Sequence, residues 1–210
     1  MNFKLPLIYP ITDASISGIP HDEQVQRLIA GGARFIQIRE KNASPRDFYE
    51  SVVKTVKIAK RHGVKLIIND RVDIALAAKA DGVHLGQDDM PPESAREILG
   101  PDAIIGYSTH TIEQARKALL LPVDYLAIGP IFQTTTKLDH GDVVGLDGLK
   151  AVRSAIGNVP LVAIGGITAD NLASVFAAGA DSAAMIGAVL SEPDEIESKM
   201  RDFIIQTSVN

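Results

Sequence analysis

Polar side chains recur at every second position of the segment FIQIREKN (35–42). Gln37, Arg39 and Lys41 alternate there with two isoleucines. Because a β-strand points successive side chains to opposite faces, these three side chains share one face and the isoleucines share the other. An amide and two cations on one face of an otherwise apolar strand are suited to bind a small anion.

Two carboxylates follow neighbouring predicted strands, Asp70 after VKLIIN and Asp89 after GVHLG. Mg²⁺ prefers one or two carboxylates together with phosphate oxygens and water. With Arg39, Lys41 and Lys137 converging from other strands, these residues suit a site for Mg²⁺ and a polyphosphate. The alternative is structural, since Asp70 could cap the following helix and Asp89 could simply begin the next one.

Glycines follow the last two predicted strands, at Gly165-Gly166 and at Gly187. They would let backbone N–H groups approach an anion at a helix N-terminus, where the helix dipole favours negative charge. The alternative is that Gly165-Gly166 only forms a tight turn. The position of these glycines after the seventh strand favours phosphate binding.

Histidines at two strand ends, His84 and His110, could act as general bases or as hydrogen-bonded structural residues. Ser108 and His110 lie too close in sequence to support a nucleophilic triad by themselves.

The elements that must position these residues alternate regularly along the chain. Apolar runs separated by amphipathic stretches predict eight strands, at residues 5–11, 33–39, 64–69, 82–86, 103–108, 124–129, 160–165 and 182–187. Helices are predicted to begin near Pro20, after Ser44 as N-cap with Pro45 as first residue, and after Thr168 as N-cap.

Strands that are apolar on both faces and separated by helices indicate a parallel sheet covered by helices. Eight such units predict one TIM-barrel domain, (β/α)₈, over residues 1–210. An open doubly wound sheet is the alternative, but no Gly-x-Gly-x-x-Gly motif follows the first strand.

The composition excludes several classes of function. The 210 residues include no Cys, which removes disulfides, thiolate nucleophiles and Cys-ligated zinc. The net charge is −5 and only 5% of residues are aromatic, which argues against nucleic acid as a partner. The segment MNFKLPLIYPITD is too short and too interrupted by proline for a signal peptide or membrane span. We expect a cytoplasmic protein without a membrane partner, and homo-oligomerisation stays open.

Taken together, the motifs resemble the thiamine-phosphate synthase family, of which the thiazole tautomerases are close relatives. The resemblance runs through Tyr9-x-x-Thr12-Asp13, Gln37-x-Arg39-x-Lys41, Asn69-Asp70, GVHLGQDD (82–89), Gly106-x-Ser108-x-His110, GPIFQTTTK (129–137) and IGGI (164–167), almost the whole chain.

The resemblance implies a transferase that joins 4-amino-2-methyl-5-hydroxymethylpyrimidine diphosphate to a thiazole phosphate and releases pyrophosphate. It implies Asp70 and Asp89 as Mg²⁺ ligands, and Arg39, Lys41, Ser108 and Lys137 as catalytic residues. Contacts to the pyrimidine diphosphate are implied for Gln37, Arg39, Lys41, Asn69, Ser108 and Lys137. Contacts to the thiazole phosphate are implied for Thr134, Thr136, Gly166, Ile186 and Gly187. The chain departs from the family at Gly187, where Ser is usual, so a hydroxyl contact to phosphate is lost there.

Other functions would use part of the same residues. A thiazole tautomerase would need an acid–base group such as His110 but no metal and diphosphate site, so Asp70, Asp89, Lys41 and Lys137 count against it. A non-catalytic phosphate-binding barrel would keep the glycines without a use for two metal carboxylates. A sugar-phosphate isomerase or epimerase on the same barrel is a further alternative.

Overall fold

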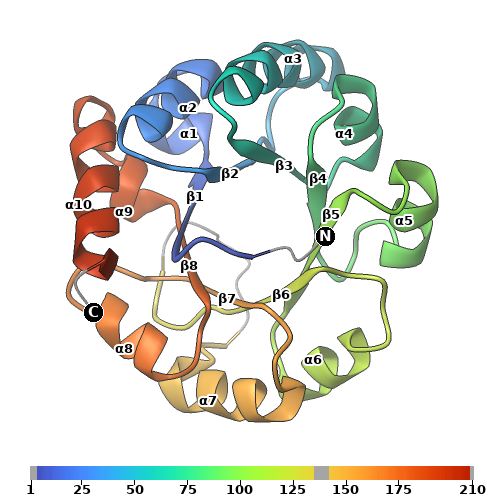
Figure 1. Cartoon of the computed structure of the whole chain (residues 1–210), viewed down its shortest axis with the longest axis vertical. Coiled ribbons are helices and arrows are strands. Elements are labelled where there is room, and N and C mark those ends of the chain that lie inside the picture. Colours follow the sequence, from blue (N-terminus) through green and yellow to red (C-terminus); the bar gives the residue numbers. More distant parts are fainter. Residues whose placement is uncertain (1–3, 135–141, 209–210) are drawn as a thin grey trace.

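The barrel predicted from the sequence is present in the computed structural model, which describes residues 4–134 and 142–208. Within these residues, eight parallel strands pair in chain order and β1 pairs with β8 to close the sheet (Figure 1). The strands are β1 (Ile8–Thr12), β2 (Phe35–Ile38), β3 (Lys65–Asn69), β4 (Gly82–Leu85), β5 (Ile104–Thr109), β6 (Tyr125–Ile128), β7 (Leu161–Ile164) and β8 (Ser182–Met185). The prediction of a (β/α)₈ barrel is therefore confirmed.

Helices surround the barrel and cover its outer face (Figure 1). They are α1 (Ala14–Ser17), α2 (His21–Ala30), α3 (Pro45–Arg61), α4 (Val72–Ala78), α5 (Pro92–Leu99), α6 (Ile112–Ala118), α7 (Gly145–Ile156), α8 (Leu172–Ala177), α9 (Gly187–Leu190), the 3₁₀ turn η1 (Pro193–Glu195) and α10 (Ile196–Ser208). As expected, α3 begins after Ser44, whose hydroxyl accepts the N–H of Asp47.

The alternation in β2 places its side chains as the sequence predicts. Ile36 and Ile38 are fully buried, and Gln37 between them is 2% exposed. Gln37 and Arg39 line a cavity inside the barrel, so the polar face of this strand points inward. The isoleucine face packs toward the helices, because neighbouring residues of a strand point to opposite sides of the sheet.

A repeated aspartate ties consecutive strands together. Asp81, Asp124 and Asp181 directly precede β4, β6 and β8, respectively. The carboxylate of Asp81 accepts the N–H of Leu66 at 2.9 Å, that of Asp124 accepts the N–H of Ile105 at 2.8 Å, and that of Asp181 accepts the N–H of Leu161 at 2.8 Å. Each aspartate thus holds the start of the preceding strand.

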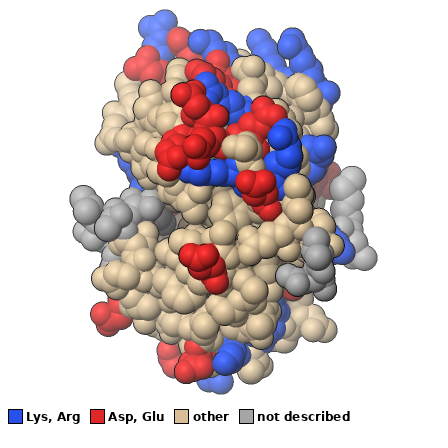
Figure 2. Space-filling view, turned by 90° about the vertical axis from the view of Figure 1, so that its left-hand side faces the viewer, with Lys and Arg blue, Asp and Glu red and all other residues tan. Residues whose placement is uncertain are grey.

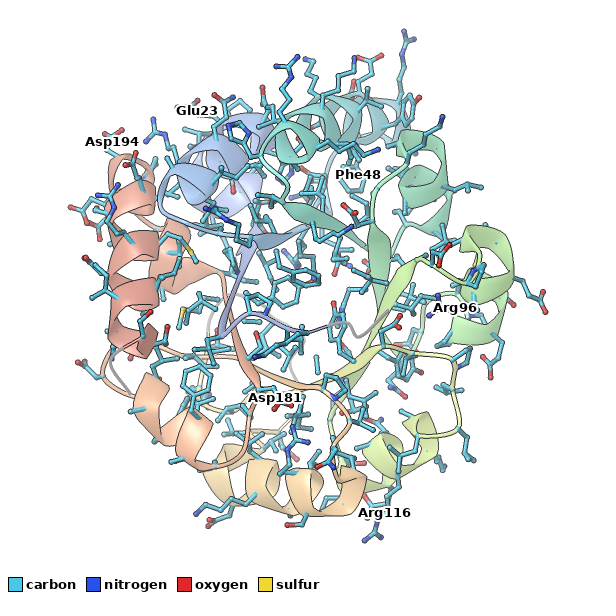
Figure 3. The ribbon with its side chains drawn as sticks, in the orientation of Figure 1. Glu23, Phe48, Arg96, Arg116, Asp181 and Asp194 are labelled. Atoms are coloured by element: carbon cyan, nitrogen blue, oxygen red, sulfur yellow. The ribbon has the colours of Figure 1, made fainter. Side chains whose placement is uncertain are left out.

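A basic side chain completes each of these carboxylate clamps. Lys65 binds Asp81 at 2.7 Å, Arg96 binds Asp124 at 2.8 Å, and Arg153 binds Asp181. Figure 3 labels Arg96 on α5 and Asp181, the residue directly before β8. At the matching position before β2 the chain has Arg34, whose carbonyl oxygen accepts the N–H of Lys65.

Surface charges of both signs are interspersed over α2, η1 and α10 (Figure 2). Arg27 pairs with Glu23 one turn earlier on α2 and with Asp194 of η1. The Asp194 side chain is 99% exposed, so this pair contributes little to stability. Among the described residues, no helix has the length and apolar content needed to cross a membrane.

The aspartate clamps predict a measurable loss of stability when one is removed. Replacing Asp124 with Ala strips the buried N–H of Ile105 of its acceptor, and an unsatisfied buried group costs about 1–3 kcal/mol. We expect the free energy of unfolding of Asp124→Ala, measured by urea denaturation, to fall by that amount. Asp194→Ala is the control, since its exposed ion pair is worth at most about 1 kcal/mol. Equal losses in the two variants would contradict the clamp.

Candidate active site

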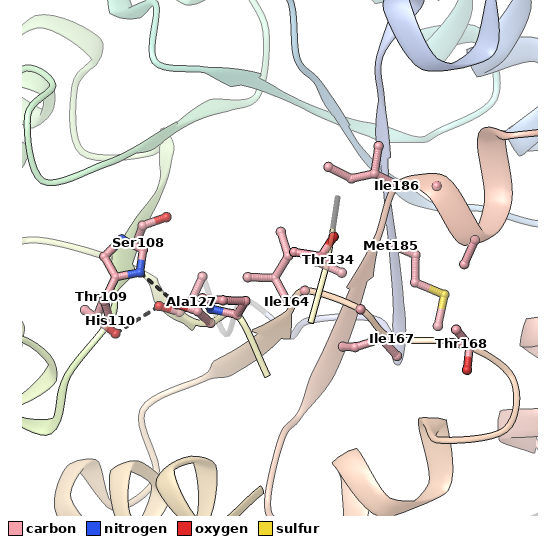
Figure 4. Close-up of a pocket in the computed structure, with 17 residues that line it drawn as sticks. Ser108, Thr109, His110, Ala127, Thr134, Ile164, Ile167, Thr168, Met185 and Ile186 are labelled. Atoms are coloured by element: carbon pink, nitrogen blue, oxygen red, sulfur yellow. Dashed lines mark hydrogen bonds between the residues drawn. The ribbon is translucent and has the colours of Figure 1, made fainter. Parts of the chain in front are cut away.

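A pocket of about 280 Å³ opens at the carboxyl ends of β5 to β8. Figure 4 shows Ser108 on one side of it, Ile186 and Met185 on the other, and Thr134 with Ile164 between them. Predicted site residues that line this pocket are Ser108, Thr134, Gly166, Ile186 and Gly187. The structure therefore brings together residues that the sequence separates by up to 79 positions.

A second, narrow cavity lies deeper inside the barrel. It has a volume of about 20 Å³, and the predicted residues Gln37, Arg39 and Asn69 line it together with His84. Ser108, Ala127, Ile164, Ala184 and Ile186 line both cavities. The two cavities thus share a wall, with polar side chains of β2 to β5 on one side and the glycine-rich ends of β7 and β8 on the other.

Asp70 and Asp89 come close enough to influence each other, as the sequence predicts. Burial raises the pKa of the Asp70 carboxyl, the nearby Lys41 opposes this, and Asp89 raises the pKa further. Lys41 forms an ion pair with Asp70. Among the described residues, the structure places no third carboxylate or histidine with this pair in a metal-binding group.

The backbone at Asp70 is strained, with φ of +62°. Residues other than glycine avoid this left-handed region, although Asp and Asn enter it more readily than most. The helix-cap alternative does not hold for Asp70, because the N-cap position of α4 is Arg71 and has no side-chain cap. Asp89 does not begin a helix either, since α5 starts at Pro92; its carboxylate accepts the N–H of Gly86 at 2.7 Å.

Arg39 is held by Asp13, which lies between β1 and α1 and which is not predicted as a site residue. Its Nη1 forms a buried ion pair with Asp13, which is 4% exposed and also accepts the N–H of Ser15 as the cap of α1. Arg39 Nε is buried and has no hydrogen-bond partner among the described residues. This nitrogen is a donor that an anion in the inner cavity could satisfy.

A second set of contacts connects the β2–α3 loop to α2. His21 Nδ1 lies 2.8 Å from the Thr12 hydroxyl, and its Nε2 lies 3.2 Å from Glu40. Burial lowers the pKa of His21, while Glu40 opposes that shift. Glu40 also accepts the N–H groups of Asn42 and Ala43, which orders the loop that carries Lys41.

The glycines after β7 lie in a turn and not at a helix N-terminus, which corrects one expectation. Helix α8 begins at Leu172, with Asn171 in the N-cap position instead of Thr168. Asn171 closes the turn, because its Oδ1 accepts the N–H of Thr168 and its Nδ2 donates to the carbonyl of Gly166. A β-carbon on Gly166 would lie 2.5 Å from the carbonyl oxygen of Gln133, so this position requires glycine. After β8, helix α9 does begin at Gly187.

Two predicted site residues, Thr136 and Lys137, lie outside the described residues. The candidate base His110 lies within them and forms a hydrogen bond to the backbone. His110 Nδ1 lies 2.7 Å from the carbonyl oxygen of Gly129 and therefore donates to it. Tyr9, which belongs to the motif Tyr9-x-x-Thr12-Asp13, and Tyr125 are not predicted as site residues, although Tyr9 lines the inner cavity. Tyr9 Oη is 2.9 Å from Tyr125 Oη and accepts from Gln37 Nε2. An interior tyrosine in an apolar strand cannot be told from ordinary core without the strand pairing.

Comparison with known proteins gives consistent relatives over nearly the whole chain. The family model described as thiamine monophosphate synthase matches residues 8–189. The thiamine-phosphate synthase of Chloroflexus aurantiacus is 47% identical over 89% of this chain and 86% of its own length. That of Clostridium novyi is 46% identical over 92% of this chain and 94% of its own. The structure of thiamine phosphate pyrophosphorylase from Pyrococcus furiosus superposes with a TM-score of 0.85 at 36% identity, covering 97% of both chains.

The strain and charge at Asp70 predict that this residue costs stability. A carboxyl whose pKa is raised on folding destabilises the folded state as the pH rises through that pKa. Asn tolerates the same backbone conformation without the charge. We expect Asp70→Asn in metal-free buffer to unfold at a higher temperature than the wild type at pH 7. The difference should shrink as the pH falls between the raised pKa and 3.8, the ordinary value, because the wild-type carboxyl becomes neutral.

Asp73→Asn is the matched control, three residues further along the chain in the first turn of α4. The hydrogen bond from Arg71 lowers the pKa of Asp73, so its charge favours the folded state. Its replacement should lower the unfolding temperature slightly at pH 7, opposite in sign to Asp70→Asn. An Asp70→Asn variant that is less stable than the wild type at pH 7 would contradict the interpretation.

Proposed function

The chain belongs to the thiamine monophosphate synthase family, and we propose that the two substrates of that reaction bind at the carboxyl ends of its strands, on the two sides of the wall that the two cavities share. The enzyme is a transferase that condenses 4-amino-2-methyl-5-hydroxymethylpyrimidine diphosphate with a thiazole phosphate. The products are thiamine phosphate and pyrophosphate.

The shared wall of the two cavities is the observation that carries this assignment. A condensation requires two ligands whose reacting atoms meet, and Ser108 and Ile186 line both cavities. The cationic and amide side chains around the inner cavity suit the pyrimidine diphosphate, which would bind on their side of the shared wall, because the inner cavity itself, at about 20 Å³, has room for little more than one water. The larger pocket, with glycine backbone at Gly166 and Gly187, suits the thiazole phosphate.

The pyrimidine diphosphate is assigned to Gln37, Arg39, Lys41, Asn69, Ser108 and Lys137. The unpartnered Nε of Arg39 supports this assignment, because a buried donor without an acceptor is costly and a phosphate oxygen would satisfy it. The ion pair with Asp13 holds the guanidinium while leaving Nε available. Gln37 is the more deeply buried residue, which favours contact with the pyrimidine ring, whereas the cations face the diphosphate.

The thiazole phosphate is assigned to Thr134, Thr136, Gly166, Ile186 and Gly187. Backbone N–H groups at the start of a helix attract phosphate, and α9 begins at Gly187. Because this chain has no hydroxyl at position 187, backbone groups and the threonines would make the phosphate contacts there.

The carboxylates of Asp70 and Asp89 fit a magnesium ion. Their mutual effect on the Asp70 pKa indicates two close carboxylates, which is the number that Mg²⁺ commonly takes from a protein when phosphate oxygens and water complete its shell. When bound, Mg²⁺ supplies positive charge to neutralise the diphosphate leaving group. Lys41, already paired with Asp70, would turn to the same diphosphate.

The chemistry needs no nucleophile from the protein. The C–O bond to the diphosphate breaks with its electron pair leaving on oxygen, and the thiazole nitrogen donates its lone pair to the resulting pyrimidine-methyl cation. Arg39, Lys41 and Lys137 stabilise the charge on departing pyrophosphate, and a charge pair at 4 Å is worth about 4 kcal/mol at intermediate dielectric. Binding both substrates along one wall supplies the orientation.

The paired carboxylates also distinguish this function from the tautomerase alternative. A tautomerase acting on a thiazole carboxylate phosphate would use the larger pocket and His110, but it would have no use for Asp70 and Asp89. The strained backbone of Asp70 and its unfavourable placement beside Asp89 would be explained by a cation that both carboxylates bind.

The proposal predicts that the purified protein forms thiamine phosphate and pyrophosphate from the two substrates and Mg²⁺. Product is measured by chromatography and by a coupled pyrophosphate assay. Arg39→Ala should lower the rate by about a hundredfold, the typical loss for one donor to developing charge. No product at any Mg²⁺ concentration would exclude the synthase function for this chain.

The assignment of Asp89 as a magnesium ligand is tested separately, by comparing substitutions at Asp89 and at its neighbour Asp88. Asp89→Ala should raise the Mg²⁺ concentration needed for half-maximal rate and lower the maximal rate, with an unchanged circular dichroism spectrum. Asp88→Ala is the matched control, since Asp88 is exposed and lies next to it in the sequence. An identical Mg²⁺ dependence of the wild type and Asp89→Ala would refute the assignment of Asp89 as a ligand.

A further inference from the structure

A continuous line of hydrogen bonds crosses the barrel interior from β2 to β5. Gln37 Nε2 donates to Tyr9 Oη at 2.9 Å, and Tyr9 Oη lies 2.9 Å from Tyr125 Oη. Tyr125 Oη lies 3.0 Å from His84 Nδ1, and His84 Nε2 lies 2.9 Å from Ser108 Oγ. We call Tyr9, Tyr125 and His84 the interior relay, which connects two residues assigned to the same substrate.

The chemistry of the first member sets the direction of the whole line. An amide nitrogen only donates, so Tyr9 Oη accepts from Gln37 Nε2, and Tyr125 Oη is the acceptor that the described residues offer to the hydroxyl hydrogen of Tyr9. Because a buried donor without an acceptor is costly, Tyr9 donates to Tyr125. Burial raises the pKa of both phenols above their ordinary value, so both keep their protons at neutral pH. We assign the hydrogen bond between Tyr125 Oη and His84 Nδ1 in the same sense, with Tyr125 as the donor, which places the imidazole proton on Nε2.

This direction determines how Ser108 can bind a ligand. Its oxygen accepts a hydrogen bond from His84 Nε2, so the hydroxyl hydrogen of Ser108 is directed to another acceptor. Ser108 lines both cavities, and a ligand atom there must accept this hydrogen bond. The other direction of the line would make Ser108 donate to His84 and would offer the ligand only an acceptor.

A glycine in the strand register makes the relay possible. Gly106 pairs with His84 on β4 and with Tyr125 on β6, so it lies between the two rings. A β-carbon at Gly106 would lie 2.1 Å from Tyr125 Cζ and 2.5 Å from His84 Nδ1. Without it, the two rings stack with centroids 5.5 Å apart. The motif Gly106-x-Ser108 thus contains the space for the relay and, two residues on along the same face, its last acceptor.

We propose that Tyr9, Tyr125 and His84 are positioning residues that fix the tautomer of His84 and thereby make Ser108 a hydrogen-bond donor to an acceptor atom of the diphosphate substrate. This inference rests on the proposed function, in which Ser108 contacts that substrate. It adds the sense of the contact and the residues that set it.

The kinetic test is a double-mutant cycle on Tyr125→Phe and Ser108→Ala. Each variant alone should lower kcat/KM by about tenfold, close to the value of one neutral hydrogen bond. The double variant should lose no more than Ser108→Ala does, because Tyr125 acts only through Ser108. Tyr49→Phe, an exposed tyrosine on α3, is the control and should keep wild-type kinetics.

The outcomes separate the relay from the proposed function. Losses that add in the double variant, or a Tyr125→Phe variant with wild-type kinetics, would overturn the relay while leaving the synthase function in place. A Ser108→Ala variant with wild-type kinetics would overturn the substrate contact and the relay together. Absence of product from the wild-type protein would overturn the proposed function itself, which the next measurement does not depend on.

The tautomer of His84 is measured without substrate, from the imidazole ¹⁵N chemical shifts of protein with labelled histidine. The His84 signals are assigned by their loss in His84→Gln. We expect a proton on Nε2 and none on Nδ1 in the wild type, and a mixture of tautomers in Tyr125→Phe. If Tyr125→Phe fails to fold, Tyr9→Phe breaks the line one step earlier and should give the same mixture. A proton on Nδ1 in the wild type would overturn the proposal.

Discussion

A polar interior can exist in this barrel only because its buried polar groups are paired. Among the described residues, Arg39 Nε and Ser182 Oγ are the buried side-chain polar atoms without a hydrogen-bond partner. An unpaired buried charge costs several kcal/mol, and an unpaired neutral group costs about 1–3 kcal/mol. The ion pair between Arg39 and Asp13 meets this requirement for the guanidinium, and the interior relay meets it for the tyrosines and His84. Arg39 Nε stands out against this background, because its missing partner coincides with a cavity that is lined by polar side chains.

Aspartates at the two ends of the barrel lie in different electrostatic environments. Below the strands, Asp81, Asp124 and Asp181 each accept a backbone N–H and a basic side chain, so their charges are compensated locally. Above the strands, Asp70 and Asp89 lie close together, and the Asp70 pKa is raised. The first arrangement stabilises the sheet, whereas the second holds unfavourable electrostatic energy that a bound cation would release. This contrast supports the metal role proposed for Asp70 and Asp89 without reference to other proteins.

The sequence predicted the barrel because the strand signal repeats eight times and the helix starts at Pro20 and Ser44 follow local chemistry. It also predicted that Gln37 and Arg39 share one face of a strand, since this depends only on the alternation within that strand, and the structure turns this face inward. It missed α1, which is four residues long and too short for a helical period. The predicted start of α8 was wrong. Thr168 was expected to cap this helix, but the side chain of Asn171 closes a turn at that point and the helix begins after it.

The residues missed in the candidate site share a physical reason. Asp13, Tyr9 and Tyr125 matter through contacts between strands, and strand register cannot be read from one strand at a time. Gly106 is the clearest case. Read along β5, it belongs to the motif Gly106-x-Ser108-x-His110, but the sequence does not tell which side chains need the space that a glycine leaves. Read across the sheet, it lies between His84 and Tyr125, where a single β-carbon would displace both rings. The direction of the hydrogen bond at Ser108 therefore depends on a glycine that carries no chemistry of its own.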